Sequence, residues 1–184
     1  MSLTDEDFRA HLDDCGLVRD PTAIAEPAPA DHLLVFAQRT DARIELASIR
    51  SHAERFFQTT LGLTVAKRYE TAFPSRDAAQ FVIASPGRAS GVRLALSRPT
   101  TSADVARAEA AERSSKMGGM GALAARCKQV WILGTEHDKD AHALLLAAIM
   151  ASVMLGPIVS GEAIFGVRGA RSRLESYDAA PQRG

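Results

Sequence analysis

The chain has few of the residue types that are diagnostic of particular functional classes. Only 5% of its 184 residues are aromatic, and no stretch interleaves aromatic with basic side chains. Lys and Arg together number 22, as do Asp and Glu, so the formal net charge is zero. Proteins that bind single-stranded nucleic acid use stacking aromatics and a basic surface, and neither is evident here. We therefore expect no nucleic-acid partner and no attraction to an anionic membrane.

Cysteine is scarce as well, and the two residues present, Cys15 and Cys127, form no CxxC pair. This favours reduced thiols over a disulfide framework. The first residues, MSLTDEDFRAHLDD, are acidic and lack the apolar core of a signal peptide, so a cytoplasmic location is expected. The sequence also has no GxSxG, HExxH or GxGxxG motif, which leaves no ready-made catalytic or dinucleotide signature.

One long apolar run, residues 141–159, approaches the length that spans a bilayer. It is rich in Ala, is interrupted by Pro157, and has strand-like apolar runs on both sides. These features favour a helix buried in a protein core, or one shared with a second subunit, over a membrane span. We therefore expect no membrane partner.

What is present is the composition of a globular domain, with 46% apolar and 24% charged residues. Residues 1–18 are expected to form a helical appendage, because Thr4 and Asp7 resemble a capping box and Gly16 would end the helix. Residues 19–31 contain three prolines and are typical of a linker. Residues 32–178 are then a single domain, followed by a frayed tail at 179–184.

The pattern within that domain predicts an α+β fold, with a mixed sheet of about six strands and helices on one or both faces. Three of the strands should form an antiparallel meander, since Pro- and Gly-containing turns join them. In its last strand Val92 alternates with Arg93, which predicts a solvent-exposed face on the Arg93 side. The expected strands are 32–38, 64–70, 79–85, 91–97, 128–134 and 162–167, and the main helices are 42–61, one starting at Thr101, 141–155, and one ending near Tyr177.

Residues 53–66, AERFFQTTLGLTVA, resemble the helix-turn-strand of a glyoxalase/dioxygenase-type βαβββ module. The resemblance covers about a quarter of the chain and implies a metal site with His or Glu ligands in the following strands. No His or Glu stands in residues 79–85 or 91–97, and no second module follows. The chain is therefore not assigned to that family.

The first candidate site follows the strand 128–134, where Glu136, His137, Asp138, Asp140 and His142 precede an apolar helix. A helix N-terminus at the carboxyl end of a strand is a common ligand position. The catalytic candidates are Glu136, His137 and Asp138, and the metal candidates are His137, Asp140 and His142. However, the two histidines are about 500° apart around a helix and do not share a face. The competing and favoured interpretation is capping by Asp138 or Asp140.

Two weaker candidates involve anions. Lys116 with Gly118 and Gly119 could cradle a phosphate as a cofactor-binding loop, but the Lys precedes the glycines and follows a helix, unlike a Walker loop. A hinge or a close helix contact is the favoured alternative. Arg168 and Arg171 follow a strand and could clamp a carboxylate or phosphate, although a turn with surface charges is the favoured interpretation because surface Arg is common.

Two hypotheses of function follow. In the favoured one, the protein is a non-enzymatic binding or interaction module that self-associates through the 141–155 helix or a sheet edge, because an apolar helix must be covered by something. In the alternative, it is a small metal- or phosphate-dependent enzyme. Its Glu136–His142 loop would then supply ligands and a base, and Arg168 would clamp an anion. The sequence identifies no cofactor.

Overall fold

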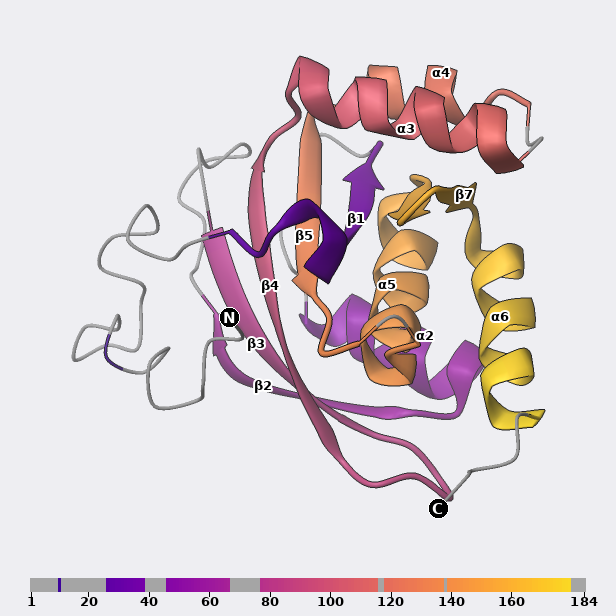
Figure 1. Cartoon of the computed structure of the whole chain (residues 1–184). Coiled ribbons are helices and arrows are strands. Elements are labelled where there is room, and N and C mark those ends of the chain that lie inside the picture. Colours follow the sequence, from indigo (N-terminus) through magenta and orange to yellow (C-terminus); the bar gives the residue numbers. More distant parts are fainter. Residues whose placement is uncertain are drawn as a thin grey trace.

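The computed structural model describes residues 10, 26–38, 46–66, 77–115, 118–137 and 139–179 (Figure 1). The predicted N-terminal appendage, apart from Ala10, lies outside the described residues, as do most of the linker and all but the first residue of the predicted tail. The candidates Lys116 and Asp138 also lie outside them.

Seven strands form one sheet in the described part of the chain, in the order β2-β3-β4-β5-β1-β6-β7. Every neighbouring pair runs antiparallel. The predicted α+β fold and its three-strand meander are confirmed, with one strand more than expected and an antiparallel rather than a mixed sheet. The strands are β1 (His32–Ala37), β2 (Thr60–Ala66), β3 (Asp77–Ala84), β4 (Gly91–Pro99), β5 (Gln129–Gly134), β6 (Ile158–Ser160) and β7 (Ala163–Phe165).

The additional strand, β6, follows the apolar helix. The predicted helix 141–155 ends as expected, since Leu155 adopts a left-handed φ of 58°, but no strand was predicted for the apolar residues 156–159 that follow it. The chain then pairs with β1 and turns back into β7 at Gly161, whose φ of 55° suits a residue without a side chain. A short hairpin therefore replaces the single strand expected at 162–167.

The helix predicted over 42–61 is shorter than expected at its carboxyl end. Helix α2 spans Leu46–Phe57, Gln58 takes a left-handed φ of 51°, and the Thr59 amide donates to the Ala53 carbonyl at 3.1 Å. This is the closing hydrogen bond of a helix C-cap. Thr60 and Leu61 then pair with β3, so strand pairing competes successfully with the helical periodicity of those residues.

Helices cover both faces of the sheet (Figure 1). On one face, α2 packs with α5 (Ala141–Met154) and α6 (Val167–Ala179). On the other, α3 (Ser102–Ser115) packs with α4 (Met120–Arg126). The predicted start of α3 is confirmed, because Thr101 and Asp104 exchange hydrogen bonds as a capping box: the Thr101 amide donates to Asp104 Oδ2 at 2.8 Å and the Asp104 amide donates to Thr101 Oγ1 at 3.3 Å.

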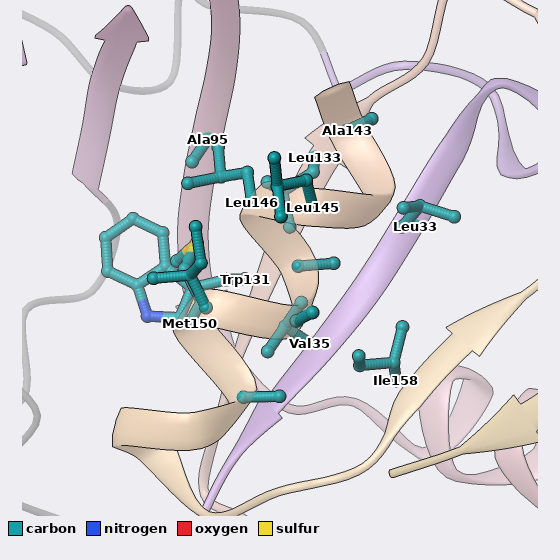
Figure 2. Packing of buried hydrophobic residues seen from close by; sticks show 14 of the residues in the cluster. Leu33, Val35, Ala95, Trp131, Leu133, Ala143, Leu145, Leu146, Met150 and Ile158 are labelled. Atoms are coloured by element: carbon teal, nitrogen blue, oxygen red, sulfur yellow. The ribbon is translucent and has the colours of Figure 1, made fainter. Parts of the chain in front are cut away.

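The apolar helix α5 lies at the centre of the larger core. Its residues from Ala143 to Ala151 are all buried, against the sheet on one side and against α2 and α6 elsewhere. Figure 2 shows Leu146 and Met150 of this helix beside Trp131 and Val35 of the central strands. The chain's own elements therefore cover the helix, and its burial does not require a second subunit. Among the described helices, none is both long enough and apolar enough to cross a membrane.

Candidate functional site

The polar loop before α5 is organised around Asp140, which begins the helix. Its Oδ1 accepts a hydrogen bond from the Ala143 amide at 2.9 Å, the geometry of an N-cap. Arg93 of β4 donates two parallel hydrogen bonds of 2.8 Å to the same carboxylate, from Nε to Oδ2 and from Nη2 to Oδ1. Burial alone would raise the pKa of Asp140, but these bonds, with those from two backbone amides, hold it below its ordinary value. Asp140 is therefore an ionised structural anchor.

The prediction that Arg93 lies on a solvent-exposed face of its strand is wrong. Arg93 is only 7% exposed, whereas Val92, its apolar neighbour, is 45% exposed. The alternation was read correctly, but the Arg93 face is not exposed to solvent: Ala95 and Ser97 on that side are buried, and so is Leu96 on the other side. A buried arginine is rare without a partner, and the partner of Arg93 lies 47 positions away. The sequence holds one signal for the burial of Arg93. An Asp that is predicted to cap a buried helix can form an ion pair with an Arg in a neighbouring strand.

The remaining residues of the loop do not converge on a metal. Glu136 accepts from Arg93 Nη1 at 3.2 Å and its side chain is 57% exposed. His137 is exposed, while His142 lies over Gly91 with its Nε2 2.9 Å from the Ala89 carbonyl oxygen. Within the described residues, no group of three His, Cys, Asp or Glu side chains could hold a metal ion. The geometry of Asp140 supports the capping interpretation of the loop.

The glycine-rich turn before α4 is also explained by contacts within the chain. Glu112 of α3 accepts hydrogen bonds from the backbone amides of Met120 at 3.1 Å and Gly121 at 2.9 Å. A Cβ on Gly121 would lie 2.4 Å from the same carboxylate, and Gly119 has a φ of 86° that favours glycine. The α4 N-terminus that follows Gly118 and Gly119 thus binds a carboxylate of the chain itself, through the amides of Met120 and Gly121.

Arg168, by contrast, lines a hollow. A depression of about 810 Å³ lies between the end of α3, the β6–β7 hairpin and the start of α6. It is lined both by residues next to the glycine-rich candidate loop and by the candidate Arg168. The residues next to the loop are Ser114, Ser115 and Met120. Ser115 Oγ accepts from the Ile164 amide at 3.0 Å and so fixes α3 to β7 at the floor. The depression has the size of a small-molecule site.

Among the described residues that line the depression, the charged ones are two arginines and one glutamate. Arg168 is exposed, and Arg173 stacks over the Phe165 ring with its guanidinium carbon 4.5 Å from the centroid. Neither has a carboxylate partner among the described residues, and Glu162 is exposed at the rim. Gly166, Val167 and Gly169 also line it, at the first turn of α6, where backbone amides lack helical acceptors. This combination can hold an anion.

Arg171, which the sequence grouped with Arg168, lies elsewhere. Its guanidinium carbon stacks 4.7 Å from the centroid of the Phe57 ring, and it donates a hydrogen bond to the Phe56 carbonyl at the end of α2. It lines a separate cavity of about 500 Å³ together with Arg55. The predicted two-arginine clamp is therefore wrong in its second member. Arg173, which the sequence did not single out, lines the depression with Arg168.

A third cavity, of about 270 Å³, lies beside His32. Arg107 Nη1 is 2.6 Å from His32 Nε2, and His32 Nδ1 is 2.9 Å from the Pro27 carbonyl oxygen. Since Arg107 only donates, Nε2 must accept and Nδ1 must carry the proton. Burial is the main cause that lowers the pKa of His32, and the Arg107 charge acts in the same direction.

In comparisons with known proteins, no family model, no curated protein and no solved structure matches the chain.

Proposed function

We propose that the protein is a non-enzymatic binding module for a small anionic ligand, and that the depression at Arg168 is its binding site. The observation that carries the proposal is a pair of arginines, Arg168 and Arg173, in a hollow of about 810 Å³, with no carboxylate partner in the part of the chain that the structure describes. A guanidinium binds carboxylate and phosphate through paired hydrogen bonds. The first-turn amides of α6 add donors and a positive dipole end.

Binding rather than catalysis is favoured by the side chains around the depression. The described lining contains no His and no Cys, and Glu162 is its one carboxylate. A general acid–base or nucleophilic mechanism would need such groups within reach of one another. The alternative enzyme at the Glu136–His142 loop gains no supporting observation, because Arg93 engages Asp140 and the Ala89 carbonyl engages His142.

We also propose self-association, through an edge of the sheet and not through α5. Since α5 is covered within the chain, the sheet edge at β2 is the better candidate for contact between copies. In the described residues β2 pairs only with β3, and an edge strand can accept another strand.

The binding proposal is tested by titrating the purified protein with inorganic phosphate and with citrate, followed by isothermal calorimetry and by the melting temperature. A ligand that binds only the folded state raises the melting temperature with its concentration. We expect saturable binding of at least one of the two anions, abolished or weakened by Arg168→Gln. Arg126→Gln, an exposed change of the same charge outside the three cavities, should bind as the wild type does. Equal binding by both variants would contradict the assignment.

A further inference from the structure

Two of the cavities meet at the same pair of residues. Ser160 and Arg173 line both the depression of about 810 Å³ and the cavity of about 270 Å³ beside His32. The two hollows therefore adjoin at the turn of the β6–β7 hairpin, opposite α6. A ligand too long for one could extend past Arg173 into the other.

The two arginines are placed differently along this path. Arg168 lines only the larger hollow, whereas Arg173 lines both. They are five residues apart on α6, which corresponds to about 7.5 Å along the helix axis and about 500° around it, so they do not share a helix face although both line the larger hollow. Contact with the Phe165 ring steadies the Arg173 guanidinium at 4.5 Å from the ring centroid, while its N–H groups have no carboxylate partner among the described residues. Beyond Arg173 the smaller cavity offers the hydroxyls of Thr135 and Tyr177.

We infer that the ligand is an elongated dianion whose two carboxylate or phosphate groups are held separately, one at Arg168 and the other at Arg173. This inference rests on the proposed function. A monoanion has a single charged group, which can form paired hydrogen bonds with one guanidinium at a time. A molecule with two anionic ends engages both cations at once, and the second contact is formed at a high effective concentration.

The test compares ligands of equal length in the full chain. Calorimetric titrations would use heptanedioate, heptanoate and a pentane-1,5-bisphosphonate, so that carboxylate and phosphonate ends are distinguished. We expect either dianion to bind at least about tenfold more tightly than heptanoate. Arg168→Gln and Arg173→Gln should each reduce the better dianion to the affinity of the monoanion. Arg173→Lys, which retains the charge, should keep most of the advantage.

The outcomes separate the two proposals. If heptanoate binds as tightly as both dianions, or if Arg173→Gln leaves dianion affinity unchanged, the dianion inference is overturned while an anion site at Arg168 stands. If none of these ligands binds, and phosphate and citrate also fail, both proposals are overturned. Circular dichroism melting of each variant establishes that it is folded, which is expected because both arginine side chains are exposed.

Discussion

At the residue scale, the ion pair between Arg93 and Asp140 determines how the polar loop should be understood. Both side chains are almost fully buried, with exposed fractions of 8% and 1%. A buried charge that loses its partner is strongly destabilising, whereas the intact pair contributes little net stability. The pair therefore acts chiefly to fix where α5 begins against β4.

We predict that Arg93→Met destabilises the protein by about 3–5 kcal/mol, since it leaves the Asp140 carboxylate buried without its cation. Urea unfolding of the variant measures the loss. The double change Arg93→Met with Asp140→Asn should recover part of it, because no uncompensated charge remains and Asn is still a good N-cap. A single variant within about 0.5 kcal/mol of the wild type would contradict this role, since that range is typical of ordinary surface changes.

A substitution at Leu155 is predicted to stabilise the protein. It is a non-glycine residue with a φ of 58° at the C-cap of α5, and its side chain is 58% exposed. The left-handed conformation costs an L-residue about 1–2 kcal/mol, which glycine avoids, although glycine loses more entropy on folding. We predict that Leu155→Gly raises the free energy of unfolding by about 0.5–1 kcal/mol. Neighbouring Gly156→Ala is the contrasting change and should be severely destabilising, because its Cβ would clash with the Phe36 carbonyl oxygen. Thermal melting compares the two, and a lower melting temperature for Leu155→Gly would refute the prediction.

The lowered pKa of His32 predicts how the stability of the fold depends on pH. Because the folded-state pKa is lowered, the unfolded chain takes up a proton near its ordinary pKa of about 6.5 while the folded chain does not. Stability should therefore fall as the pH drops below about 6.5, and His32 should make no contribution to the slope well above that value. We expect His32→Gln, which can still accept from Arg107, to lose less stability than the wild type between pH 7.5 and pH 5. Parallel curves for the two proteins would rule out His32 as the cause.

At the element scale, the junction between α3 and α4 illustrates what a pattern can and cannot predict. The break in the helix at the glycines was predicted, because glycine interrupts helices. The role of Glu112 could not be predicted in this way, because its spacing of four residues from Lys116 is typical of an exposed ion pair, whereas its carboxylate accepts hydrogen bonds from the amides beyond the break. Periodicity identifies the faces of one element, but it does not specify which residue of a neighbouring element reaches a given backbone group.

The prediction at this scale concerns the same contact. Replacing Glu112 with Ala removes the acceptor of the Met120 and Gly121 amides and should cost about 1–2 kcal/mol, the range for losing a helix N-cap. Glu109→Ala, one turn earlier on α3 and exposed, is the matched control and should change stability by less than about 0.5 kcal/mol. Hydrogen exchange of the α4 amides would localise the effect. Unchanged exchange there in the Glu112 variant would contradict the capping role.

At the scale of the whole molecule, the order of elements was largely predictable and their neighbours in space were not. Pro, Gly and alternating apolar residues indicated most strands and helices, whereas the pairing of β1 between β5 and β6 depends on contacts between distant segments. The candidate sites show the same division. A helix cap was predicted at Asp138 or Asp140, but Arg93 and Arg173 take their importance from side chains that the fold brings to them.

We propose that the chain binds an anion at Arg168 and that the polar loop before α5 has only a structural role. The most direct measurement is calorimetric titration of the bound anion into Glu162→Gln and Arg168→Gln. Removing the rim carboxylate should tighten binding and removing the guanidinium should weaken it, each by about three- to tenfold, since partly screened charges near a surface contribute on the order of 1 kcal/mol. Unchanged affinity in both variants, or the opposite pair of signs, would contradict the account.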